Sequence, residues 1–188
     1  MHGITSYDDI AKREKTHQAR LIGIFIEHGY DSDARRWLMD TWAAINRDSK
    51  DNWDLLVPVT GLTGHVPNSV DIHLCDLIRR NYGLEDEDVP CIVLDNFNGS
   101  RNQVVLSLRG SDEDRKFLLT NVSNVMASET VREINRKSKN CREQMIRHVV
   151  KHLRTLKLRK DAVKYAPTAF SLFTKTALKI FFQKPPLP

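Results

Sequence analysis

The stretch EDVPCIVLDNFNGSRNQVVLSLRGS, Glu87 to Ser111, contains a proline and then two apolar runs. The runs, Cys91 to Leu94 and Val104 to Leu108, are separated by a segment rich in Asn, Gly and Ser. Two such runs joined by turn-forming residues are typical of an antiparallel hairpin. The stretch therefore predicts a hairpin that the chain enters through Val89 and Pro90.

The hairpin is followed by a predicted helix. Ser111 and Asp114 have the spacing of a capping box, in which each side chain bonds the backbone of the other. The helix carries apolar residues at helical spacing, namely Phe117, Leu118, Val122 and Val125.

Upstream of the hairpin, predicted helices and strands alternate. The unbroken apolar run at residues 21–26 predicts a central strand, and residues 53–59 predict a second strand that ends near Pro58. Amphipathic spacing predicts one helix over about residues 7–17 and another from residue 69 to Gly83. A further helix carries an apolar face of Trp37, Leu38, Thr41, Trp42 and Ile45.

These elements predict an α/β fold with a mixed four-stranded sheet flanked by helices. Strands linked through helices are expected to run parallel, and the final hairpin is antiparallel. This order resembles the thioredoxin-like fold, and YGLEDEDVPCIVLDNF is similar to that fold's passage into its third strand. The resemblance implies that Pro90 follows a cis peptide bond. It covers roughly residues 18–127.

The redox members of that family carry a C-x-x-C pair directly after the first central strand. The helix dipole there lowers the pKa of the attacking thiol. In this chain the corresponding segment is Tyr30, Asp31, Ser32 and Asp33, and none of these side chains exchanges a disulfide. Thiol-disulfide oxidoreductase activity is therefore not expected.

The chain has three cysteines, at positions 75, 91 and 141, without C-x-x-C spacing. Such a set is typical of reduced thiols in a cytosolic protein. Cys91 follows the proline, but within an apolar strand it is expected to act as a small buried hydrophobe.

Other catalytic signatures are missing from the sequence. It contains no nucleotide-binding glycine loop, no G-x-S-x-G elbow and no H-E-x-x-H motif. His148 and His152 have the spacing for one metal ion, but neighbouring basic residues and the lack of a third ligand favour a solvated face. Neither a metal nor a cofactor is therefore predicted.

If the chain is an enzyme or binds a small ligand, the resemblance implies a site where Tyr30–Asp33 approach Val89, Pro90 and Cys91. The GYDSD loop between a strand and a helix also resembles, loosely, the opening of flavodoxin-like signalling domains of the TIR class. Such a domain needs five parallel strands, which the antiparallel hairpin opposes.

The charge of the chain is strongly asymmetric. Residues 129–188 contain 15 Lys and Arg against 4 Asp and Glu, a net charge of +11, whereas residues 1–128 have a net charge of −6. We therefore predict an acidic thioredoxin-like domain over residues 1–128 and a basic helical extension over residues 129–188. The extension either neutralises the acidic body or contacts something anionic.

Residues 129–160 show an apolar stripe at helical spacing, which predicts one helix of some thirty residues with Arg and Lys on its other sides. The segment after Pro167 is a second amphipathic stretch. It could fold back on the long helix, lie in an anionic membrane interface or dock in a partner's groove. Candidate binding residues of the extension are Arg142, Arg147, Lys151, Arg154, Phe170, Phe173, Lys175, Lys179 and Phe181.

The sequence thus predicts a non-catalytic interaction or scaffold protein whose basic extension binds a protein partner, another copy of the chain or an anionic surface. Nucleic acid is an alternative partner. Residues 129–160 have no aromatic side chain for base stacking, so such binding would be nonspecific. The polar N-terminus and the lack of a long apolar run predict a cytoplasmic protein, with peripheral membrane attachment as an option.

Overall fold

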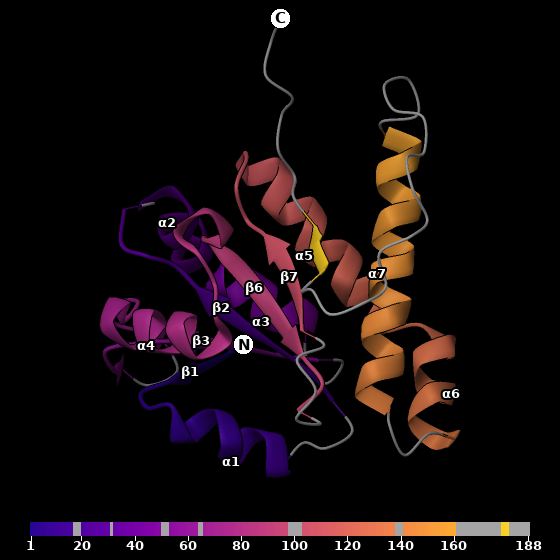
Figure 1. Cartoon of the computed structure of the whole chain (residues 1–188), viewed down its shortest axis with the longest axis horizontal. Helices are drawn as coiled ribbons and strands as arrows, with labels where there is room; N and C mark the ends of the chain where they lie inside the picture. Colours follow the sequence, from indigo (N-terminus) through magenta and orange to yellow (C-terminus); the bar gives the residue numbers. More distant parts are fainter. Residues whose placement is uncertain are drawn as a thin grey trace, which may run out of the picture.

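The computed structural model describes residues 1–16, 20–30, 32–49, 53–63, 66–97, 103–137, 141–160 and 178–180. Within these ranges the chain is a mixed α/β structure, in which a sheet is flanked by helices (Figure 1).

The sheet of the body contains five strands in the order β1-β3-β2-β6-β7. They are β1 (His2–Ile4), β2 (Leu21–Ile26), β3 (Trp53–Pro58), β6 (Cys91–Asp95) and β7 (Val104–Ser107). The prediction of four strands missed β1. Its three residues include one buried side chain, Ile4, which is too little for an alternating pattern. A short strand, β8 (Leu178–Ile180), pairs in parallel with β7.

The direction of the strands follows the prediction only in part. Strands β1 and β2 both run parallel to β3, and β6 and β7 form the predicted antiparallel hairpin. The expectation that all helix-linked strands are parallel is wrong for β6, which runs antiparallel to β2. The reason is that Leu84–Pro90 returns the chain to the end of β2, where Cys91 pairs with Ile26.

Contacts of the backbone hold this returning segment. The Val89–Pro90 peptide bond is cis, as the resemblance implied. Arg109 donates from Nε to the carbonyl of Val89 at 3.0 Å and from Nη2 to that of Asp86 at 3.0 Å. The amide of Leu108 donates to the carbonyl of Pro90 at 2.8 Å, which fixes the start of β6 beside the end of β7.

The helices before the hairpin cover both sides of the sheet. They are α1 (Asp8–Thr16), α2 (Ser32–Asp40), α3 (Trp42–Ser49) and α4 (Ile72–Tyr82). Helix α4 packs on β2 and β3, while α3 lies behind the sheet in Figure 1 with α5 (Asp112–Met126). A two-stranded ribbon, β4 (Leu62–Thr63) and β5 (Val66–Pro67), precedes α4, and a 3-10 turn, η1 (Asp86–Asp88), follows it.

Of two helix predictions, one differs from the structure and one is confirmed. The helix predicted around Trp37–Ile45 is divided into α2 and α3 at Thr41, whose hydroxyl donates to the carbonyl of Trp37 at 2.6 Å. Such back-bonding by Thr bends helices. The capping box predicted for α5 is present, with Ser111 and Asp114 bonding each other's backbone amides.

The long helix predicted over residues 129–160 is wrong as a single element. The structure has α6 (Glu129–Lys137) and α7 (Cys141–Lys160), which lie side by side (Figure 1). Helix α7 packs along α5 and also contacts β2 and β6. Its apolar stripe, represented by Met145, Val149 and Leu153, is buried there. The predicted apolar stripe is therefore present, and the body of the same chain covers it.

No helix within the described ranges is both long enough and apolar enough to cross a membrane.

Burial of α7 leads to a first prediction. Met145→Ala should lower the free energy of unfolding by about 2–5 kcal/mol, because Met145 is fully buried and its loss leaves a cavity. The exposed neighbour Gln144→Ala should change it by less than about 0.5 kcal/mol. Urea denaturation followed by circular dichroism measures both. Equal, small effects would show that α7 is not part of the core.

Candidate functional site

The groove predicted from the sequence is only partly assembled. Strand β2 ends and β6 begins at the same end of the sheet, where Ile26 pairs with Cys91. The segment after Ile26 and the segment before Cys91 are therefore neighbours where they leave the sheet. Val89, Pro90 and Cys91 are buried, whereas the Tyr30 side chain is 92% exposed. These residues therefore do not form a common lining.

Two further residues of the predicted groove, Ser32 and Asp33, lie at the start of α2. Asp33 is exposed and pairs with Arg36 at 2.7 Å, as expected for a surface i,i+3 pair. Ser32 is the first residue of α2, and Asp31 lies outside the described residues.

The buried thiols of Cys75 and Cys91 have pKa values that make them unreactive. Burial raises the pKa of the Cys75 thiol to about 12 and that of the Cys91 thiol still higher. Because the thiolate is the reactive form, both groups stay protonated and unreactive near neutral pH. The geometry therefore gives no support to atypical thiol chemistry at Cys91.

A buried carboxylate, Glu27, lies at the end of β2, and sequence analysis missed it. Its side chain is fully buried, and its Oε1 atom lies 3.5 Å from Nη1 of Arg35 in α2. The ion pair fixes α2 to the end of β2. A charged residue directly after the apolar run LIGIFI was the only signal in the sequence.

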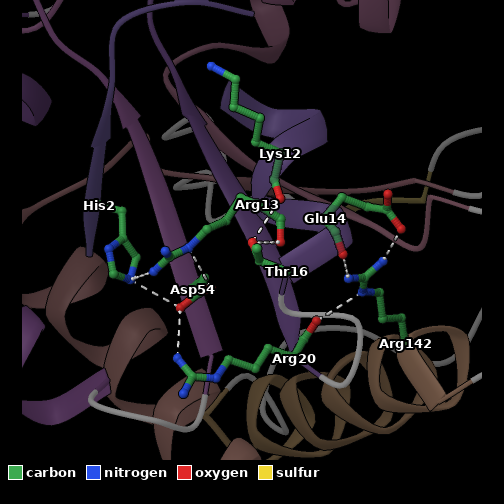
Figure 2. Close-up of polar contacts among 8 residues, drawn as sticks. All are labelled: His2, Lys12, Arg13, Glu14, Thr16, Arg20, Asp54 and Arg142. Carbon is green, nitrogen blue, oxygen red and sulfur yellow. Dashed lines mark hydrogen bonds and ion pairs between the residues drawn. The ribbon is translucent and has the colours of Figure 1, made fainter. Parts of the chain in front are cut away.

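The densest charge cluster of the described residues surrounds Asp54 on β3 (Figure 2), and sequence analysis missed it too. The carboxylate is fully buried and lies 3.2 Å from Nε2 of His2, 3.0 Å from Nε of Arg13 and 3.3 Å from Nη1 of Arg20. The Arg13 guanidinium also contacts the imidazole of His2. These groups come from β1, α1 and the start of β2, so one buried charge joins three elements.

The pKa of Asp54 reflects two opposing effects. Burial of the carboxyl by itself raises its pKa, because desolvation disfavours the charged form. The hydrogen bond from His2 and the charges of Arg13, His2 and Arg20 together outweigh this effect and hold the pKa well below its usual range. Asp54 is therefore ionised in the folded protein and acts as a structural charge.

Arg142 of α7 belongs to the same region and is not on a free surface (Figure 2). It is buried and donates from Nε to the carbonyl of Arg20 at 3.0 Å, from Nη1 to Oε1 of Glu14 at 3.0 Å and from Nη2 to the carbonyl of Glu14 at 2.9 Å. Its Cζ atom lies 5.3 Å from the centre of the Phe97 ring. The residue predicted to bind a partner instead fastens α7 to the body.

The other predicted binding residues of α7 remain exposed. Arg147, Lys151 and Arg154 lie on the side of the helix away from its buried stripe, at i, i+4 and i+7. Arg147 pairs with Glu143 at 2.5 Å. Phe170, Phe173, Lys175 and Phe181 lie outside the described residues, and Lys179 is placed only by the backbone of β8.

This row, Arg147, Lys151 and Arg154, is the candidate binding surface, and we call it the α7 cationic row. His148 and His152 are half-buried beside it. Over the part of the chain that the structure describes, no three His, Cys, Asp or Glu side chains are grouped to hold a metal ion. The row can thus attract anions but offers no ligand set for a cation.

Searches of protein-family models, curated proteins and solved structures found no match to the chain.

The Asp54 cluster predicts a pH-dependent loss of stability. Asp54→Asn should lower the free energy of unfolding at pH 7 by about 3 kcal/mol, the low end for breaking a buried ion pair, because Arg13 and Arg20 keep some contact with water. The pKa of Asp54 is lowered on folding, so its stabilisation exists above the unfolded-state pKa of about 3.9 and is lost as the pH falls below it. Urea denaturation at pH 7 and pH 3 should therefore show a smaller gap at pH 3. A gap of the same size at both values would contradict the role of the charge.

Arg142 gives a second prediction for this region. Arg142→Met should cost about 1.5–3 kcal/mol, the range for hydrogen bonds that involve a charged group. Arg142→Lys should recover little of this, because one ammonium cannot replace a guanidinium that reaches two carbonyls and a carboxylate. A double-mutant cycle with Glu14→Gln, followed by urea denaturation, isolates the ion pair. Wild-type stability of Arg142→Lys would refute this geometry.

Proposed function

We propose that the chain is a non-catalytic binding protein, in which a thioredoxin-like α/β body presents a basic helical surface to an anionic partner. The observation that carries the proposal is that the two sides of α7 have different surroundings. Its apolar stripe is used by the core, while Arg147, Lys151 and Arg154 stay exposed. Because the apolar side of α7 is buried against the body of the chain, a partner contacts this helix through its charged side chains.

Several features support a thioredoxin-like body. Two parallel strands, β2 and β3, lie beside an antiparallel hairpin of β6 and β7, with helices flanking the sheet. A cis proline precedes β6, at the place where the resemblance expects it. The added strand β1 extends this set at one edge without interrupting it.

The non-catalytic part of the proposal is supported by the chemistry of the groove. The C-x-x-C pair is replaced by Tyr30–Asp33, and the pKa values of the Cys75 and Cys91 thiols are raised by burial. The buried carboxylates Glu27 and Asp54 are each engaged by arginine, which suits fastening of elements better than proton transfer.

The burial of the apolar side of α7 bears on how a partner would contact this helix. An amphipathic helix that docks in a groove or enters a membrane interface must offer its apolar side. In α7 that side, which includes Met145, Val149 and Leu153, faces the body. The partner is therefore an anionic protein segment, an anionic surface or another polyanion, and its binding weakens as salt rises.

This proposal predicts that neutralising the α7 cationic row abolishes binding. The variant Arg147→Gln/Lys151→Gln/Arg154→Gln and the wild-type full chain would be titrated against a polyglutamate peptide, phosphatidylserine vesicles and an oligonucleotide in 50 mM salt. The wild type should bind at least one of these probes, and the variant should bind it at least tenfold more weakly, because the row supplies the attraction.

The matched control is Lys15→Gln/Arg36→Gln/Lys116→Gln. It removes the same formal charge from exposed positions on α1, α2 and α5. It should bind like the wild type. Failure of the wild type to bind any probe, or equal binding by the two triple variants, would refute the proposal.

A further inference from the structure

The α7 cationic row is a line of three exposed side chains along one side of the helix. The three side chains recur at four- and three-residue intervals, so the row follows the helix axis for about 10.5 Å. Within the described residues, Lys151 and Arg154 form no salt bridge. Arg147 pairs with Glu143, and its side chain is nevertheless exposed. At least two of the three charges are thus available to a ligand.

A linear polyanion matches this row in charge and in linear form. One strand of a nucleic acid presents a phosphate about every 3.4 Å along its axis. The length of the row therefore spans about three phosphate intervals, so each of its three cationic side chains can reach a separate phosphate. Arginine adds geometric fit, because its guanidinium can bind a phosphate through two parallel hydrogen bonds.

The surroundings of the row favour a strand over a membrane. A vesicle surface is broad and would bring the acidic body, of net charge −6 over residues 1–128, close to anionic headgroups. A strand needs contact only along the line of the row. In addition, the other exposed residues beside the row, such as Gln144 and Thr155, are polar and have nothing to insert into a bilayer.

The row also lacks the means to distinguish bases. Residues 129–160 contain no Phe, Trp or Tyr, and the only rings on α7, the imidazoles of His148 and His152, are half-buried. Contacts to phosphate fix position but carry no sequence information. This surface would therefore recognise the phosphate backbone of a nucleic acid and not its bases.

From these observations we infer that the α7 cationic row binds the phosphate backbone of a nucleic acid strand without reading its sequence. The inference rests on the proposed function and deepens it, because it names the class of the anionic partner. Binding neutralises about three phosphates, and Arg142 takes no part because its guanidinium is occupied by Glu14 and Arg20.

The test uses the full chain and fluorescence anisotropy of a labelled oligonucleotide of about 20 nucleotides, longer than usual single-strand sites. The logarithm of the association constant should fall with the logarithm of salt with a slope of about −2 to −3, which is a loss of about 16- to 64-fold between 50 and 200 mM. Scrambling the sequence should leave the affinity within about twofold. The expected slope per contacted phosphate is about −0.7 for a single-stranded probe and about −0.9 for a duplex probe, so both probes are titrated.

Variants complete the test. Arg147→Gln/Lys151→Gln/Arg154→Gln should lose at least tenfold in affinity at 50 mM salt and flatten the slope by about 2 to 3, while the control at Lys15, Arg36 and Lys116 keeps the wild-type slope. Circular dichroism should show that both variants are folded. Loss of binding with the control alone, or a slope unchanged by the row variant, overturns the inference.

The other probes distinguish the two proposals. Binding of polyglutamate or phosphatidylserine vesicles through the row, without binding of the oligonucleotide, overturns the nucleic-acid inference and leaves the proposed function standing. The absence of binding to all three probes overturns both.

Discussion

The packing of α7 against α5 and the sheet is the constraint on which the rest of the molecule depends. Met145, Val149 and Leu153 bury the apolar stripe of this helix in the common core. Once that stripe is buried, the orientation of the helix about its own axis is fixed, and so is the set of side chains that faces solvent. The cationic row is exposed because the opposite side of α7 cannot leave the body without uncovering core residues.

Charge performs two different tasks in this protein, and burial separates them. Asp54 and Arg142 are buried, and each holds several elements together through ion pairs and hydrogen bonds (Figure 2). Arg147, Lys151 and Arg154 are exposed, and surface charges of this kind contribute little to stability. A count of basic residues in the C-terminal part therefore overstates the surface that is free to bind, because at least Arg142 is part of the architecture.

The two buried charges are linked through residue 20. Its side chain reaches Asp54, and its carbonyl accepts from Arg142. Helix α1 makes the same connection with consecutive residues, since Arg13 binds Asp54 and Glu14 binds Arg142. The N-terminal helix is thus held at the same time by β3 and by α7. This arrangement joins α1, the sheet and α7, the helix that carries the exposed row.

The sequence by itself determined the local elements, because their signals are short in range. The run LIGIFI predicted the buried strand β2, Ser111 and Asp114 predicted the cap of α5, and Val89-Pro90 followed by two apolar runs predicted the hairpin. Only the tertiary structure decided which strands are neighbours, that β1 joins the sheet, and that α6 and α7 are separate helices. It alone showed that Arg142 is buried and that His2, Arg13 and Arg20 meet at Asp54. Those contacts join residues as far apart as positions 14 and 142, and no local pattern encodes a contact between such distant positions.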